Sequence, residues 1–77
     1  MSTVTIRYFA SIREQLGRAN ERIELSSPTS AGDIWQQAAG GLLPSNTLVA
    51  INQIYASPQT LVHPGDELAF FPPVTGG

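Results

Sequence analysis

The chain has 77 residues, of which 42% are hydrophobic and 13% charged, and it contains no cysteine. A chain of this length forms one small domain. Without cysteine, disulfides, zinc–thiolate sites and a thiol nucleophile are excluded. Four basic residues, all arginine, oppose six acidic ones for a net charge of −2. Because no basic run follows a phosphate backbone, we expect no nucleic-acid partner.

The sequence also bears on cellular location and on metal binding. No stretch approaches the roughly 20 apolar residues that a membrane-spanning helix needs. The N-terminus also lacks the basic and apolar regions of a secretory signal. We therefore expect a cytoplasmic protein with no membrane partner. The single histidine, His63, has no cysteine or second histidine to act with it, so no metal site is expected and a turn residue is the simpler interpretation.

The first third of the chain alternates between strand and helix patterns. Residues 3–9 alternate polar and apolar side chains, which is typical of a half-buried strand. Residues 10–16 carry apolar side chains four apart and precede Gly17, which predicts a helix of about two turns with a glycine cap. Residues 22–25 alternate again and predict a second strand, antiparallel to the first.

The middle of the chain predicts a second helix and a hairpin. Thr29 or Ser30 can cap a helix that ends at Gly40, and Trp35 on this helix is expected in the core. Residues 48–51 and 54–55 predict two strands around a tight turn. Asn52 is expected to serve that turn by bonding local backbone.

The last strand is expected over residues 67–71, after a type II turn at Pro64-Gly65. Its alternation places Phe71 on the outward face, whereas Asp66 and Glu67 point to opposite sides and cannot form an acid/base pair. The chain is too short for a doubly wound sheet. One mixed sheet packed on a central helix fits, which is the α+β, ubiquitin-like β-grasp fold.

After this strand the sequence reads Phe70-Phe71-Pro72-Pro73-Val74-Thr75-Gly76-Gly77. The two prolines lack N–H donors, so the sheet cannot continue. We therefore expect a β-grasp domain over residues 1–71 and an extended, flexible tail over residues 72–77. The terminal glycines have no Cβ and can pass through a narrow channel. Once activated, for instance by adenylation, a terminal carboxylate can react with an amine to give an amide, or with sulfur to give a thioester or thiocarboxylate.

Several segments together resemble one known family, the small subunits of molybdopterin synthase, which are sulfur carriers of molybdenum cofactor biosynthesis. The resemblance covers essentially the whole chain. It is carried by Phe9-Ala10 with Arg13-Glu14, by Ala50 to Gln53, by Pro64-Gly65-Asp66-Glu67 and above all by Phe70 to Gly77. It implies that Gly77 is adenylated, converted to a thiocarboxylate, and donates sulfur to cyclic pyranopterin monophosphate to form the molybdopterin dithiolene.

The resemblance also implies partners and residue roles. The partners are the large subunit, in a heterotetramer of two small and two large subunits, an E1-like adenylating enzyme and a sulfur donor protein. The chain itself binds no cofactor, since ATP is used by the activating enzyme, and it has no catalytic side chain. Gly77 bears the sulfur and Gly76 gives clearance in the channel. The expected partner-binding residues are Phe71, Pro72, Pro73, Val74, Thr75 and, towards the activating enzyme, Arg13.

Other functions remain open from the residues alone. A sulfur carrier for another pathway, such as thiazole synthesis, would use the same chemistry. A ubiquitin-like protein modifier would form isopeptides with lysines on its targets, although the absence of lysine here excludes chains of modifiers linked through lysine. A non-covalent interaction module would make no use of the two terminal glycines.

Overall fold

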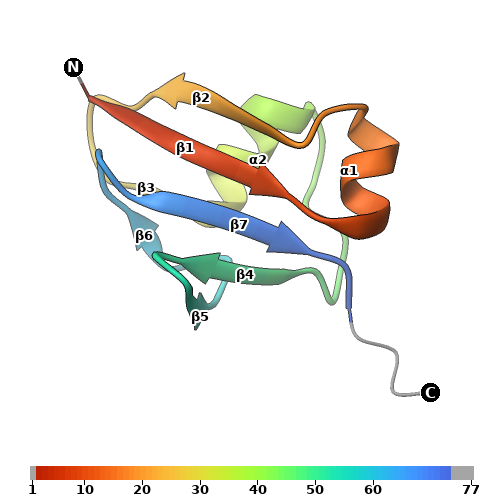
Figure 1. The fold of residues 1–77 in the computed structure, drawn as a ribbon. Coiled ribbons are helices and arrows are strands. Elements are labelled where there is room, and N and C mark those ends of the chain that lie inside the picture. The colour runs from red at the N-terminus through yellow and green to blue at the C-terminus, as the bar shows by residue number, and fades with distance from the viewer. Residues whose placement is uncertain (1, 74–77) are drawn as a thin grey trace.

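The computed structural model describes residues 2–73, which form two helices and seven strands (Figure 1). In chain order they are β1 (Thr3–Tyr8), α1 (Ala10–Leu16), β2 (Asn20–Glu24), β3 (Thr29–Ser30), α2 (Ala31–Ala39), β4 (Leu48–Ile51), β5 (Ile54–Ala56), β6 (Leu61–Val62) and β7 (Glu67–Phe71). Five strands form one sheet in the order β2-β1-β7-β4-β5. The predicted helices and main strands are confirmed, with shifts of one or two residues at their ends.

The five-stranded sheet is mixed. β1 and β7 run parallel, whereas the β1–β2, β4–β7 and β4–β5 pairs are antiparallel. β7 is the central strand and has a partner on both sides. Figure 1 shows α2 across one face of the sheet and α1 at the end to which β1 and β7 point. The predicted α+β β-grasp fold, with a mixed sheet packed on a central helix, is confirmed.

The core lies between α2 and the sheet face that the helix covers. Alternation along the strands sends every second side chain to this face. The sheet and α2 supply the fully buried apolar residues Val4, Ile6, Ile34, Val49, Leu68 and Phe70, each at most 1% exposed. Trp35 packs edge-on against the Phe70 ring at 4.9 Å and is 5% exposed, which confirms its predicted place in the core.

Local capping fixes the helix ends as predicted. Ser30 is the N-cap of α2, and its Oγ accepts a hydrogen bond from the Asp33 N–H at 3.2 Å. Gly17 and Gly40 end the two helices in the left-handed conformation, with φ of 74° and 80°. A residue with a Cβ is disfavoured there, which is why a glycine after an apolar stripe was informative.

A second, two-stranded sheet was not predicted. β3 and β6 pair antiparallel, with Thr29 opposite Val62 and Ser30 opposite Leu61. Each strand has only two residues, so neither shows an alternating pattern in the sequence. Val62 is fully buried, and the pairing closes one end of the core beside the start of α2.

Candidate functional site

The end of β7 is the point from which the tail departs. Parallel pairing sets Phe70 beside Tyr8, and the Phe9 N–H donates to the Phe70 carbonyl at 3.2 Å. β7 ends at Phe71, and Pro72 and Pro73 follow outside the sheet. Because β7 is central and bonded on both sides, the exit point is rigidly placed. The roles predicted for Val74, Thr75, Gly76 and Gly77 lie outside the described residues.

Phe71 projects from the face of the sheet opposite α2, here called the open face. Its ring stacks on the Phe9 ring at 4.6 Å, with an angle of 9° between the planes, and meets the Tyr55 ring edge-on at 6.3 Å. We call these three side chains the aromatic cluster. Tyr55 is 73% exposed and Phe9 37% exposed. Exposed aromatic rings beside the tail exit are well suited to anchor a partner protein, because aromatic residues dominate binding energy at interfaces.

Beside the aromatic cluster the open face is hollowed. This aromatic hollow has a volume of about 230 Å³. Its floor is made by Ala50 and Ala69, which lie opposite each other on β4 and β7 and are at most 9% exposed. Ala69 thus lies on the open face, yet it is covered by its larger neighbours. Arg7, Gln53 and Glu67 complete the lining.

The backbone between β1 and α1 positions Phe9. Ala10 adopts φ of 52°, a left-handed conformation that costs a residue with a Cβ about 1–2 kcal/mol. The Phe9 carbonyl accepts from the N–H groups of Ile12 at 3.1 Å and Arg13 at 3.4 Å, so α1 begins at once after the strand. This abrupt switch holds the Phe9 ring against Phe71. Nothing in the sequence predicts it, since alanine is not a residue that favours positive φ.

A polar clamp fixes the hairpin that carries Tyr55. Asn52 and Gln53 form its turn with φ of 51° and 70°, as a two-residue hairpin turn of type I′ requires. The Asn52 Nδ2 donates to Asp66 Oδ1 at 3.0 Å, and its Oδ1 accepts from the Glu67 N–H at 3.0 Å. The predicted bond from Asn52 to local backbone is therefore wrong, because its side chain instead ties the hairpin to the start of β7.

Asp66 is the other half of this clamp. Its Oδ2 accepts a hydrogen bond from the His63 N–H at 2.9 Å, within the turn that precedes β7. This bond, and then the one from Asn52, holds the pKa of Asp66 below its ordinary value. Glu67 points to the open face, where its Oε2 lies 2.8 Å from the Arg7 Nε. The two adjacent carboxylates thus have separate partners and separate structural uses.

The sequence and the fold are similar to those of known proteins. The model of the ThiS family matches residues 6–77. The chain belongs to the ThiS family. A relative from Haemophilus influenzae, named molybdopterin synthase sulfur carrier subunit, is 37% identical over 96% of this chain and 99% of its own length. Further relatives at 32–35% identity carry the same name.

Solved structures of similar fold extend the comparison. SAMP1, a small archaeal modifier protein of Haloferax volcanii, matches with a TM-score of 0.81 and 27% identity, over 97% of this chain and 99% of its own. A chain from the complex of subunits 1 and 2 of the Helicobacter pylori molybdopterin-converting factor matches with a TM-score of 0.64 over 97% of this chain and 99% of its own. At 19% identity, that second match shows the shared fold alone.

Another polar cluster in this ThiS-family domain is structural. The Tyr8 hydroxyl and the Arg18 Nε both donate to Glu21 Oε1 at 2.7 Å, and the Arg18 Nη2 donates to the Ala38 carbonyl at 2.7 Å. Burial, and then Glu21, raises the pKa of Tyr8, so its hydroxyl stays protonated. Burial alone would raise the pKa of Glu21, but the bonds from Tyr8 and Arg18 outweigh it and lower that pKa. The cluster ties β2 to the end of α2.

Arg13 lies on α1, close to the tail exit. It lines a second hollow of about 160 Å³ together with Arg7 and Phe9. Its side chain is exposed, so it is available to a partner. The structure thus brings two of the predicted partner-binding residues, Phe71 and Arg13, to the same end of the domain, with Phe9 beside both. In residues 2–73, no helix is both long and apolar enough to cross a membrane.

Proposed function

We propose that this chain is the sulfur-carrier subunit of molybdopterin synthase and that it carries sulfur as a thiocarboxylate on Gly77. The observation that carries the proposal is the exposed aromatic cluster at the end of the central strand, next to the two prolines that begin the tail. Such a domain can dock on a partner while its tail enters that partner's active site. The relatives at 32–37% identity support the choice of pathway.

The chemistry proceeds in three steps. An activating enzyme joins the Gly77 carboxylate to the α-phosphate of ATP and releases pyrophosphate. A persulfide of a donor protein then attacks the acyl carbon and displaces AMP to give an acyl disulfide, and a second thiol of the donor attacks the S–S bond, which releases the thiocarboxylate and leaves a disulfide on the donor. In the large subunit this sulfur forms a C–S bond with cyclic pyranopterin monophosphate, water hydrolyses the resulting thioester and returns the Gly77 carboxylate, and two such transfers supply the dithiolene. Gly76 and Gly77 are the smallest residues that could occupy the partner channels.

The side chains of this subunit serve docking rather than catalysis. Phe71, packed on Phe9, is the anchor, and Pro72 and Pro73 direct the tail away from the sheet without offering N–H donors. Val74 and Thr75 then contact the partner channel, and Arg13 contacts the activating enzyme. ATP-dependent activation and assembly into a heterotetramer of two small and two large subunits fit a cytoplasmic protein.

The test is intact mass spectrometry of the full chain after incubation with the activating enzyme of the same organism, ATP and a sulfur donor. We expect an adenylated species and then the exchange of one oxygen for one sulfur at Gly77. Transfer to the purified large subunit with cyclic pyranopterin monophosphate should yield molybdopterin. Deleting Gly77 should abolish both reactions and leave the thermal midpoint unchanged. If neither adenylation nor sulfur exchange occurs, the proposal is wrong.

A protein-modifier function is the second candidate, because SAMP1 of Haloferax volcanii has the same fold at 27% identity. A modifier would form an amide between Gly77 and a lysine of a target protein. Expression of the chain in its own organism, with an N-terminal affinity tag, distinguishes the two functions. Covalent conjugates of higher mass that disappear on deletion of Gly77 would establish modification, and their absence would leave the sulfur carrier alone.

A further inference from the structure

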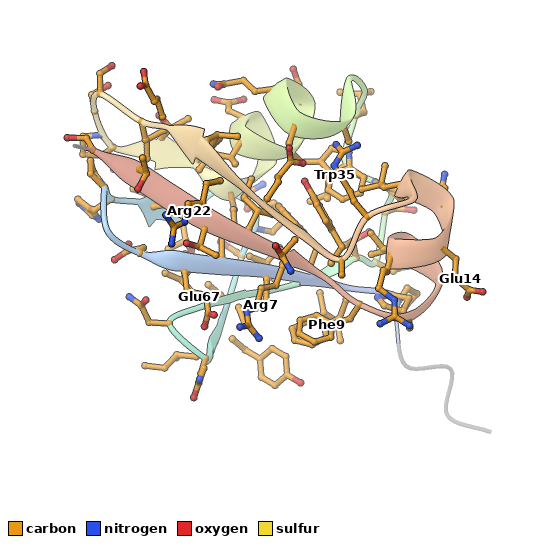
Figure 2. The ribbon with its side chains drawn as sticks, turned by 45° about the horizontal axis from the view of Figure 1, so that its top comes forward. Arg7, Phe9, Glu14, Arg22, Trp35 and Glu67 are labelled. Atoms are coloured by element: carbon orange, nitrogen blue, oxygen red, sulfur yellow. The ribbon has the colours of Figure 1, made fainter. Side chains whose placement is uncertain are left out.

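Among residues 2–73, Arg7 is the only basic side chain that lines the aromatic hollow. Its Nε lies 2.8 Å from Glu67 Oε2, and the two side chains are 55% and 32% exposed. Figure 2 shows Arg7, Glu67 and Phe9 on the side of the sheet opposite Trp35. Within residues 2–73, this ion pair is the one polar contact of the Arg7 side chain. Both Nη groups therefore keep hydrogen-bonding capacity for a partner.

The Arg7 guanidinium is already paired with Glu67 before any partner arrives. Glu67, which anchors it, has its own N–H bonded to Asn52 Oδ1, and its carbonyl accepts from the Asn52 N–H at 2.8 Å. The backbone of Glu67 is thus bonded to Asn52 through both its N–H and its carbonyl. An arginine with a fixed Nε loses less conformational freedom when its Nη groups bind a carboxylate than a free one does.

With Glu67 paired to Arg7, the positive charge of Arg13 nearby leaves this end of the domain slightly basic in an acidic protein. Arg7 also lines the smaller hollow that contains Arg13, on the path from β1 to α1. None of the described residues that line this smaller hollow is acidic, although the whole chain has a net charge of −2. Two arginines thus lie near Phe9 at the end from which the tail departs. This local charge favours an acidic group on whatever surface covers the open face.

We propose that Arg7 is a specificity-determining residue of the open face, and that its Nη groups bind a carboxylate of the molybdopterin synthase large subunit. This inference rests on the proposed function. At about 230 Å³ the aromatic hollow is smaller than the roughly 300–1,000 Å³ of small-molecule sites. It therefore suits an apolar side chain of the partner, presented next to the carboxylate that binds Arg7.

This arrangement discriminates between partners. A protein that covers Arg7 without an acceptor would leave its Nη groups desolvated and unpaired, which is unfavourable. Glu67 repels a carboxylate placed above it and so confines the acidic group to the far edge of the guanidinium. Rejection of surfaces that lack the acidic group is then as important as attraction of the right one.

The test measures binding of the full chain to the purified large subunit of the same organism by surface plasmon resonance at several salt concentrations. Arg7→Glu should raise the dissociation constant about tenfold or more, mainly through a faster dissociation rate. Arg7→Ala should raise it less and flatten the salt dependence. Arg7→Lys should bind between Arg7→Ala and wild type, since a single ammonium cannot form the forked contact.

A matched control is the double variant Gln36→Glu/Gln59→Glu. It changes the net charge by the same amount as Arg7→Glu, but it does so beside α2, where both residues line a different hollow. The dissociation constant of this control should stay within about twofold of the wild-type value, because salt screens charges beside α2 from a partner bound to the open face. If this control weakens binding as much as Arg7→Glu does, the effect is one of net charge and the proposal is wrong.

The remaining outcomes separate this inference from the proposed function. If wild type binds and both Arg7→Glu and Arg7→Ala bind equally well, the role of Arg7 is refuted while the carrier function stands. If the wild-type chain does not bind the large subunit at all, the proposed carrier function is refuted, and the role of Arg7 is refuted with it. Reversing acidic residues of the large subunit one at a time to arginine should restore binding of Arg7→Glu at one position. Failure at every acidic position on the interface refutes the proposal.

Discussion

The polar clamp makes a quantitative prediction at Asn52. Replacing Asn52 by alanine removes two side-chain hydrogen bonds, to Asp66 Oδ1 and from the Glu67 N–H. Each such bond contributes about 1 kcal/mol. Alanine must also adopt φ near 51°, which costs about 1 kcal/mol. Because the clamp is exposed and water replaces part of the lost bonding, we expect Asn52→Ala to lower the free energy of unfolding by about 2–3 kcal/mol.

The matched variant Asn52→Gly separates the two contributions. Glycine loses the same two hydrogen bonds but tolerates the left-handed conformation. We therefore expect a loss of about 1–2 kcal/mol, roughly 1 kcal/mol smaller than for alanine. In a domain of this size 1 kcal/mol shifts the thermal midpoint by about 4–8 °C. The thermal midpoints of the two variants should thus differ by about 4–8 °C.

The measurement is urea and thermal unfolding followed by circular dichroism, with both variants and wild type at the same pH and salt concentration. If Asn52→Ala and Asn52→Gly both unfold within about 0.5 kcal/mol of wild type, the clamp contributes nothing and the reasoning fails. If Asn52→Gly is the less stable of the two, the assigned backbone cost is wrong. Docking gives a second readout, because a loosened hairpin should also displace Tyr55 from the aromatic cluster.

Three further predictions concern Phe71, Asp66 and Gln53. Phe71→Ala should weaken binding to the large subunit by about tenfold or more, measured by surface plasmon resonance, with its circular dichroism spectrum unchanged; wild-type affinity would show that Phe71 is no anchor. Because the pKa of Asp66 is lowered by folding, its contribution is complete above the unfolded-state pKa of about 3.9 and is lost as the pH falls through the folded pKa. The free energy of unfolding of Asp66→Asn should therefore vary less with pH below about pH 4 than that of wild type. Identical pH profiles of the two proteins would exclude this linkage. Gln53→Gly should raise the thermal midpoint by up to about 5 °C, since φ of 70° favours glycine, and a lower midpoint would contradict the type I′ assignment.

Much of the fold could be predicted because its signals are local. The alternation along residues 3–9 and 67–71 fixed which side chains enter the core, and Ser30, Gly17 and Gly40 fixed the helix ends. Each of these signals depends on neighbours a few residues away. The β3–β6 pairing carried no such signal, since two residues are too few to show a period.

The candidate site was only partly predictable. The outward direction of Phe71 is predictable because side chains alternate between the two faces along β7. Its stacking on Phe9 was not expected, since it depends on the left-handed turn at Ala10. Asn52 was assigned to its own turn, but its side-chain partners lie 14 and 15 residues away. No local pattern singles out Arg7, because its ion pair with Glu67 exists only when β1 lies beside β7.

The sequence by itself thus determined the two helices and the strands of the five-stranded sheet, the inward and outward faces of those strands, and the composition of the tail from Phe70 to Gly77. These follow from the two-residue repeat of a strand, from helix capping and from the missing donors of proline. Only the tertiary structure decided which outward residues meet. Parallel pairing of β1 with β7 joins the first and last strands and sets Phe9 beside Phe71 and Arg7 beside Glu67. Such contacts depend on strand register across long sequence separations, which no local pattern specifies.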